Sequence, residues 1–119
     1  ALLADLREKG VLRRPERAYA VLEVVNGAEN MPRGTVFRVE SRGLKVGRGK
    51  QNDVIVPDHF TSIEHARFRM RRGTLTIEDL GSTNGTYVNG ERIDTPVDLV
   101  VGDYVKIGSI IFKVREVAK

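Results

Sequence analysis

The sequence predicts an all-β fold, an eleven-stranded antiparallel β-sandwich that follows a short N-terminal arm. Three observations support this prediction. From residue 18 onward, short runs rich in β-branched and aromatic residues follow one another closely. Glycine, asparagine and proline separate these runs at positions typical of turns. No interior segment repeats with the period of an amphipathic helix, so sheets must bury the apolar side chains.

We expect residues 1–17 to form an arm or linker and residues 18–119 to form the folded domain. Leu2, Leu3 and Leu6 fit one face of a short helix that Gly10 would end. A helix this short is marginal in water, so the arm should have little structure of its own. The chain begins with Ala rather than Met, which predicts a fragment or a processed protein.

The predicted strands occupy most of the chain after the arm. The clearest alternation lies in residues 65–71, where Ala66, Phe68 and Met70 alternate with arginines, as expected of a half-buried strand. A similar alternation predicts that Ile110 and Phe112 share a buried face near the C-terminus. In order, the expected strands are 19–25, 35–39, 43–47, 53–56, 65–71, 74–80, 86–88, 91–93, 97–100, 104–107 and 110–117.

Composition narrows the functional classes. The chain has 119 residues, enough for one domain, and its net charge of +4 suits contact with phosphate but not a dedicated DNA-binding surface. It has no cysteine, which excludes disulfides and thiolate metal sites. It has neither a secretory signal nor a membrane-spanning apolar run. We therefore expect a cytoplasmic location, alone or as the cytosolic part of a larger or membrane-anchored protein.

The stretch from Asp79 to Gly90 is the most informative part of the sequence. It contains two Asn-Gly pairs, Asn84-Gly85 and Asn89-Gly90, and such pairs favour tight hairpin turns with positive φ. Between them there is room only for a very short strand. The preceding Ser82 and Thr83 then lie at a turn tip, where polar side chains face solvent or a ligand.

Catalytic and metal-binding motifs are weak. Residues 43–50 look like a phosphate-binding loop, but the glycine spacing and the residue after the lysine do not fit the nucleotide P-loop. His59 and His65 lack the spacing of a zinc site. Ser62 and His65 lack both a nucleophile-elbow pattern and an orienting carboxylate. We therefore expect neither an enzyme nor a bound cofactor or metal.

Five blocks of the sequence, in order and at the right spacing, resemble the forkhead-associated (FHA) domain of bacterial type. The blocks are Gly47-Arg48, residues 52–56, residues 62–66, residues 78–90 and Gly102-Asp103. The resemblance covers about residues 20–117. It implies an eleven-stranded sandwich, in agreement with the strand count, and a non-catalytic module that binds phosphothreonine peptides. Bacterial members often serve Ser/Thr kinase signalling.

The resemblance also implies roles for individual residues. Arg48 would contact the phosphate, Ser62 would donate its hydroxyl to a phosphate oxygen, and Thr83 would help to form the phosphothreonine site. Asn84 would bond to the ligand backbone. These roles are chemically reasonable, because a phosphothreonine carries nearly two negative charges and three acceptor oxygens. The positions with an implied architectural role are Gly47, His65, Gly85, Asn89 and Gly90. Beyond the resemblance, Lys50, Ile63 and Ser82 are candidates for additional ligand contacts.

One position departs from the family pattern. After the loop serine the family often has Arg, Lys or Asn, whereas this chain has Ile63. Losing one charge-assisted hydrogen bond would remove about 1.5–3 kcal/mol of binding free energy. Three explanations remain open: the affinity is modest, or Lys50 compensates, or Ile63 contacts an apolar ligand residue or covers the core.

The expected partner is a phosphothreonine-containing protein or peptide. A Ser/Thr kinase, or a substrate of such a kinase, is the candidate for this partner. The alternative is phospho-independent association through a sandwich face, where Tyr87, Ile111 and the arginines of residues 67–71 point outward. We expect no nucleic-acid partner, because aromatic side chains are not interleaved with these outward arginines. We also expect no membrane contact by this part of the chain.

Overall fold

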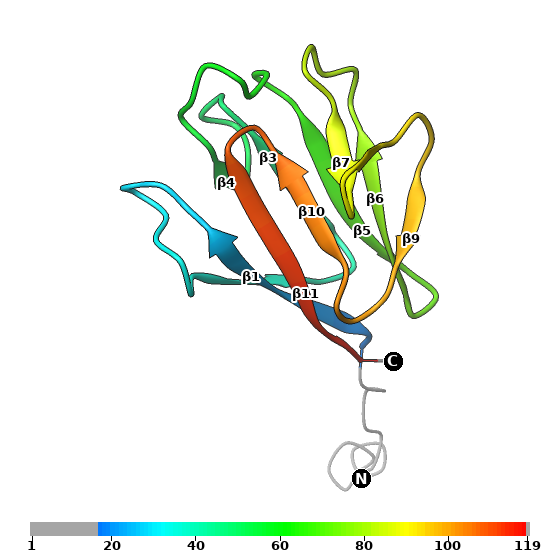
Figure 1. The fold of residues 1–119 in the computed structure, drawn as a ribbon. Coiled ribbons are helices and arrows are strands. Elements are labelled where there is room, and N and C mark those ends of the chain that lie inside the picture. The colour runs from blue at the N-terminus through cyan, green and yellow to red at the C-terminus, as the bar shows by residue number, and fades with distance from the viewer. Residues whose placement is uncertain (1–16, 119) are drawn as a thin grey trace, which may run out of the picture.

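The computed structural model describes residues 17–118, which form two packed β-sheets and no helix that could cross a membrane (Figure 1). The predicted arm therefore lies outside the described residues, apart from Arg17. The strands are β1 Tyr19–Asn26, β2 Val36–Val39, β3 Leu44–Gly47, β4 Val54–Ile55, β5 Ala66–Arg71, β6 Thr74–Asp79, β7 Thr86–Val88, β8 Glu91–Arg92, β9 Val97–Leu99, β10 Tyr104–Ile107 and β11 Ile110–Ala118. All eleven expected strands are present, and no strand end differs from its expected position by more than one residue.

The sheet order confirms the predicted sandwich. Six strands form one sheet in the order β2-β1-β11-β10-β7-β8, and five form the other in the order β4-β3-β5-β6-β9. Every pair is antiparallel except β3 with β4. The two-residue β4 runs parallel to β3 because the intervening loop folds back on the strand: the Asp53 amide donates to the Lys45 carbonyl and the Val56 amide to the Gly47 carbonyl, both at 2.9 Å.

The core lies between the two sheets and is made by alternate side chains of each. Phe68 of β5 meets Phe112 of β11 edge to face, with ring centroids 5.8 Å apart. Both rings are fully buried, as are Ile77 on β6 and Val24 on β1. Aromatic pairs in this geometry add to the stabilisation from burial alone. The predicted alternation on β5 is therefore correct, since its arginines face outward.

The two Asn-Gly pairs behave differently. Asn89 and Gly90 both have positive φ, 51° and 87°, and close the predicted tight hairpin between β7 and β8. The hairpin expected at Asn84-Gly85 is wrong. This pair ends a loop that crosses from β6 in one sheet to β7 in the other, and only Gly85 has a positive φ. The Asp79 carboxylate holds this loop through the hydrogen bonds described below.

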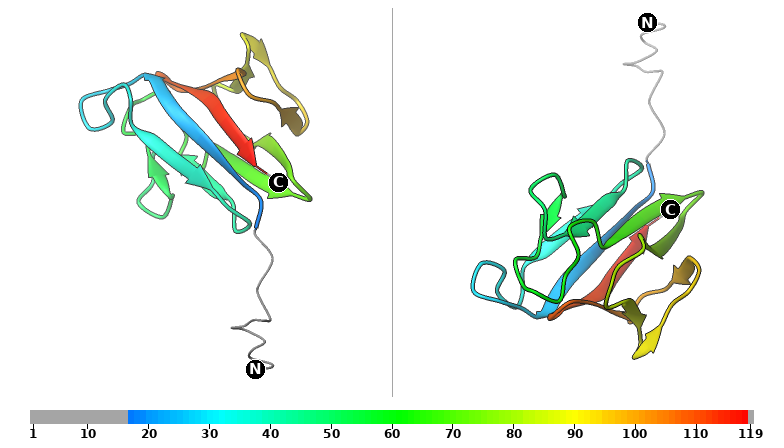
Figure 2. Two further views of the ribbon diagram at one scale, coloured as in Figure 1. Left: turned by 90° about the horizontal axis from the view of Figure 1, so that it is seen from below. Right: turned by 90° about the horizontal axis from the view of Figure 1, so that it is seen from above.

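Strand β1 starts and strand β11 ends at one end of the sandwich, and three of the loops lie at the other (Figure 1). Strands β1 and β11 lie side by side, with Tyr19 paired to Ala118 (Figure 2). The loop of residues 56–65 and the loop of residues 80–85 lie at the other end, together with the β10–β11 turn (Figure 1). This end presents most of the residues for which the sequence predicts a functional role.

Candidate functional site

Three loops bring the predicted ligand residues together. Arg48 lies in the β3–β4 loop, Ser62 in the β4–β5 loop, and Thr83 and Asn84 in the β6–β7 loop. The Arg48 amide donates to the Ser62 carbonyl at 2.8 Å, and the Thr83 amide donates to the Ser62 hydroxyl at 3.1 Å. Residues that are up to 36 positions apart in the sequence thus share one small surface, and Ser62 stands at its centre.

The Ser62 hydroxyl accepts one hydrogen bond and keeps its own donor capacity. Its oxygen already accepts the Thr83 amide, so its own proton is available to a ligand. Ser62 is half-buried, whereas Thr83 and Asn84 are exposed. The Asn84 side-chain nitrogen donates to the Phe60 carbonyl at 3.0 Å, which ties this loop to the loop that carries Ser62.

The Arg48 guanidinium is held at one nitrogen and open at the others. Its Nε donates to the Thr61 carbonyl at 3.0 Å, which orients the planar group. No carboxylate in residues 17–118 forms an ion pair with Arg48. An exposed, oriented guanidinium without an acidic neighbour is suited to bind an anion through its terminal nitrogens.

His65 is fully buried and connects two of the loops. Its Nδ1 accepts the Ser62 amide at 3.0 Å, and its Nε2 lies 2.8 Å from the Gly85 carbonyl. An acceptor Nδ1 and a carbonyl partner at Nε2 require the neutral ring with its proton on Nε2. The ring bonds to the Ser62 backbone and not to its hydroxyl, so the geometry is not that of a nucleophile with its base.

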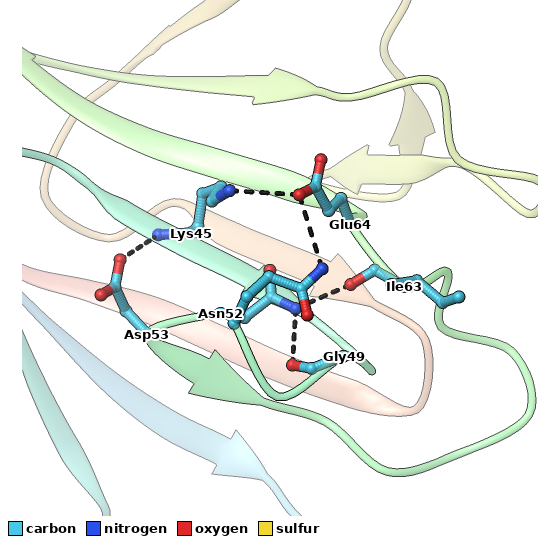
Figure 3. Close-up of polar contacts among 7 residues, drawn as sticks. Lys45, Gly49, Asn52, Asp53, Ile63 and Glu64 are labelled. Atoms are coloured by element: carbon cyan, nitrogen blue, oxygen red, sulfur yellow. Dashed lines mark hydrogen bonds and ion pairs between the residues drawn. The ribbon is translucent and has the colours of Figure 1, made fainter.

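Asn52 braces the same region from the β3–β4 loop, and it is a residue to which sequence reasoning assigned no role. Its side-chain nitrogen donates to the Gly49 carbonyl at 2.8 Å and to the Ile63 carbonyl at 2.7 Å (Figure 3). Gly47 makes this approach possible. A Cβ there would overlap the Ile63 carbonyl and lie 2.8 Å from the Asn52 amide nitrogen. An asparagine within a glycine-rich loop was the available signal.

Asp79 organises the β6–β7 loop. Its carboxylate accepts the Gly81 and Ser82 amides at 3.1 and 2.9 Å and the hydroxyls of Ser82 and Thr86, both at 2.6 Å. Burial raises the pKa of Asp79, but the hydrogen bonds from Ser82 and Thr86 outweigh burial and hold the pKa below its usual value. The Ser82 hydroxyl also accepts the Gly85 amide at 2.9 Å, so its bonds lie within the loop.

Asp58 joins the β4–β5 loop to the β10–β11 turn and was also missed. It accepts the Ser109 amide at 3.0 Å, the Thr61 hydroxyl at 2.8 Å and the Phe60 amide at 2.9 Å. The Ser109 hydroxyl also donates to Asp58, at 2.5 Å. Burial raises the pKa of Asp58, but the hydrogen bonds, led by that from the Ser109 hydroxyl, leave it below its usual value. An aspartate three residues before a threonine indicates a local turn, but nothing in the sequence points to Ser109.

The other predicted residues lie at the edge of this surface or away from it. Ile63 is 53% exposed, so it does not cover the core, and its side chain points away from the Asn52 amide (Figure 3). Lys50 is exposed in the same loop as Arg48. Asn89 is remote. It donates to the Asp103 carboxylate at 3.0 Å and accepts the Tyr104 amide at 2.9 Å, which fastens the β7–β8 hairpin to β10.

A groove of about 510 Å³ continues from the candidate site. It is lined by Asn26, Phe60, Asn84, Gly85, Tyr87, Lys106, Gly108 and Ser109. Asn84 and Phe60 border both the groove and the loop surface, so a chain bound at the site has room to extend. Among residues 17–118 no group of three or more histidine, aspartate or glutamate side chains is placed to hold a metal ion.

Comparison with known proteins agrees with this geometry. The family model of the FHA domain matches residues 44–108, which contain every candidate ligand residue. The chain belongs to the FHA domain family. The family match confirms the sequence resemblance, and the two-sheet structure confirms the predicted fold. FHA domains bind phosphothreonine peptides.

Individual relatives place this FHA domain among regulatory binding modules. It is 37% identical over 97 residues, 71% of this chain, to the glycogen accumulation regulator GarA of Mycolicibacterium smegmatis. It is 33% identical over 103 residues, 87% of this chain, to the FHA domain-containing protein FhaB of Mycobacterium tuberculosis. The matches span 61% and 64% of those proteins' lengths. A solved structure, Mycobacterium tuberculosis EmbR in complex with a low-affinity phosphopeptide, has a TM-score of 0.72 at 27% identity, over 99% of this chain and 29% of that one.

Proposed function

We propose that this FHA domain is a non-catalytic reader that binds a phosphothreonine segment of a partner protein through Arg48, Ser62, Thr83 and Asn84. One observation carries the proposal. The Ser62 hydroxyl accepts the Thr83 amide and keeps its proton for a ligand, next to an Arg48 guanidinium that no described carboxylate neutralises. A cationic fork beside a free hydroxyl donor matches the charge and the acceptor oxygens of a phosphoryl group.

Each residue has a separate role in this proposal. Arg48 contacts the phosphate with its terminal nitrogens, and Ser62 donates its hydroxyl proton to a phosphate oxygen. Thr83 sits against the phosphothreonine and orients Ser62 through its amide. Because the Asn84 amide nitrogen is held by the Phe60 carbonyl, its side-chain oxygen is free to accept an N–H of the ligand backbone.

Of the three additional ligand contacts expected from the sequence, one supports the loop and two remain candidates. Ser82 serves the loop, since its hydroxyl bonds to Asp79 and Gly85. Lys50 and Ile63 remain candidates for ligand contact, because both are exposed near Arg48 and Ser62. Lys50 supplies a second cation, whereas Ile63 offers only apolar surface. We therefore propose that the phosphate is held by fewer charge-assisted bonds than in relatives with a basic residue after the serine.

The proposed setting is Ser/Thr kinase signalling in the cytoplasm, with the kinase or one of its substrates as the phosphoprotein. The relatives support this, since they include a metabolic regulator and further FHA proteins. Catalysis is not part of the proposal, because His65 is committed to two backbone bonds. Neither nucleic acid nor a membrane is required as a partner.

The test is calorimetric titration with a phosphothreonine peptide chosen from a library screen. The Arg48→Ala variant should weaken binding at least hundredfold. The Ser62→Ala variant should weaken it by about 10- to 150-fold, equivalent to about 1.5–3 kcal/mol for a hydrogen bond to a charged group. Arg33→Ala, a loop arginine outside the site, is the matched control and should bind as the wild type does. Equal affinity for the phosphorylated and unphosphorylated peptides would refute the proposal.

A second candidate function rests on a neighbouring groove, which shares Tyr87 and Lys106 with the groove beside the candidate site. On the outer face of the six-stranded sheet, Tyr87, Gly90, Tyr104, Lys106 and Ile111 line a groove of about 400 Å³ that suits phospho-independent association. An interaction that survives Arg48→Ala but is lost on Ile111→Asp would favour this function over phosphothreonine binding.

A further inference from the structure

The outer face of the five-stranded sheet carries a row of three arginines, Arg67, Arg69 and Arg71, called here the arginine row. All three point outward from β5, while Phe68 and Met70 between them are buried. Outward residues two positions apart on a strand are about 6.5–7 Å apart. The row therefore presents three guanidinium groups at regular intervals, away from the proposed phosphothreonine residues.

Most of this charge is not neutralised within the domain. Arg67 approaches Glu78 only at 3.8 Å, and its Nε is buried without a hydrogen-bond partner in the described part of the chain. Arg69 and Arg71 form no ion pair within residues 17–118. Their cross-strand neighbours on β6 are threonines, Thr76 and Thr74. Cations this close repel one another, so an anion on the row would be stabilised.

A shallow hollow lies over the row. It has a volume of about 260 Å³ and is lined by Ser41, Arg42, Arg67, Arg69, Met70 and Arg71. Four of these side chains are cationic and none is acidic. Arg42 pairs with Asp53 at 3.4 Å and Arg67 with Glu78 at 3.8 Å, so Arg69 and Arg71 carry the unpaired charge of the hollow among the described residues. The hollow is smaller than a pocket that encloses a drug-sized ligand, so it fits one or two anionic groups of a longer chain.

We propose that the arginine row binds an extended acidic segment of a protein partner, with carboxylates at alternate positions. Side chains on one side of an extended peptide repeat every two residues, at the same 6.5–7 Å interval as the arginines. A peptide lying along β5 can therefore place successive carboxylates opposite Arg67, Arg69 and Arg71. Paired guanidinium–carboxylate contacts of this kind favour bidentate geometry and specific register.

Other polyanions fit this face less well. Single-stranded nucleic acid needs aromatic stacking surfaces, and the outward positions of β5 and β6 are arginine, threonine and glutamate. A duplex or an anionic membrane is wider than the row and would meet Glu64, Glu78 and Asp98, which lie on either side of it. A narrow acidic chain along β5 meets only Glu78, beside Arg67, while Arg69 and Arg71 face threonines on β6. A protein segment is therefore favoured.

The arginine row and the proposed phosphothreonine site can be tested separately. Strand β5 begins directly after His65, and its six residues place Arg71 about 17 Å further along the sheet. The probe is a six-residue peptide of alternating Glu and Ser, with the Gln-Ser peptide as its uncharged match. Each is titrated into the ¹⁵N-labelled domain and followed by NMR. A phosphothreonine peptide is titrated separately and reports only on the loops around Ser62.

The Glu-Ser peptide should shift the amides of β5 and β6 and bind at least tenfold more tightly than the Gln-Ser peptide. The double variant Arg69→Gln/Arg71→Gln should raise its Kd at least tenfold and leave phosphothreonine binding within twofold. The control double variant Arg33→Gln/Lys113→Gln loses the same charge elsewhere and should change the Kd less than twofold. Raising NaCl from about 50 to 300 mM should weaken the interaction, as expected for exposed charges.

Three results would overturn the inference. They are equal or undetectable binding of the two peptides to the wild type, an equal loss in the control variant, and shifts confined to the loops around Ser62. Tight binding of duplex DNA or of phosphatidylserine vesicles that is lost in Arg69→Gln/Arg71→Gln would overturn the choice of a protein partner. Because the phosphothreonine peptide is a separate arm, its failure would count against the proposed function and not against the row.

Discussion

Replacing Asp79 with Asn should loosen the loop that carries Thr83 and Asn84. The carboxylate accepts four hydrogen bonds, from the Gly81 and Ser82 amides and from the Ser82 and Thr86 hydroxyls. In Asp79→Asn the amide oxygen can still accept the two backbone amides. The NH₂ group then faces the two hydroxyls, which must rotate to accept instead of donate.

The expected loss is about 2 kcal/mol of unfolding free energy. A hydrogen bond to a charged group contributes about 1.5–3 kcal/mol and a neutral one about 0.5–1.5 kcal/mol, so each of the four bonds weakens by about 1 kcal/mol. Their sum of about 4 kcal/mol is an upper bound, because neighbouring contacts are not additive and Asp79 is only partly buried. Thr86 is fully buried, so water cannot replace the hydrogen bond that its hydroxyl loses, and a measurable part of the destabilisation remains.

The pH dependence gives a second, independent readout. The pKa of Asp79 is lower in the folded protein than its usual value, so its contribution to stability is present above about pH 4. That contribution is lost as the pH falls through the folded-state pKa. The stability gap between wild type and Asp79→Asn should therefore be largest at neutral pH and should close near pH 2.

Urea unfolding at both pH values measures the gap directly. The pKa of Asp58 is also below its usual value, but Asp58 is present in both proteins, so its contribution cancels in the difference. Asp94→Asn makes the same chemical change at an exposed position and should leave the unfolding free energy within about 0.5 kcal/mol. A gap that is absent at pH 7, or that stays constant down to pH 2, would refute this account of Asp79.

Three further substitutions test other parts of the site. Gly47→Ala should cost about 1–3 kcal/mol of stability by thermal unfolding, because its Cβ would overlap the Ile63 carbonyl; an unchanged melting temperature would contradict this. Asp58→Asn should speed hydrogen exchange of the Ser109 amide, which loses a charged acceptor, and unchanged exchange would count against the bridge. Ile63→Arg should raise phosphopeptide affinity about tenfold in the titration used for Arg48→Ala, and an unchanged affinity would show that no cation is missing.

The fold could be predicted almost entirely from the sequence because each strand carries its own signal. Alternating side chains predicted which face of β5 is buried, and turn residues marked where strands stop. The strand pairing could not be predicted in the same way. Asn84-Gly85 has the composition of a hairpin turn, yet it ends a loop that crosses between the sheets. The conformation of this loop is held by hydrogen bonds to Asp79, five residues before Asn84, so the Asn-Gly pair alone could not predict it.

The exposed residues of the candidate site carry a clearer signal in the sequence than the residues that support them. Arg48, Ser62 and Asn84 stand in motifs of a known family, and the structure brings them within one set of loops. Asn52 and Asp58 act through backbone carbonyls and amides of other loops. A backbone group has no signature of its own in the sequence, so these partners become visible only when the loops are folded together.

The same distinction between backbone and side chain applies at Ile63. The supporting bonds at this position use its backbone: the Ile63 carbonyl accepts the Asn52 amide nitrogen at 2.7 Å and the Gly49 amide at 3.1 Å. The side chain is half exposed and takes no part in them. The loop that presents Ser62 is therefore held in place whatever the side chain at position 63 is. This separation lets position 63 adjust ligand affinity alone, so Ile63→Arg should change binding while leaving the melting temperature as it is.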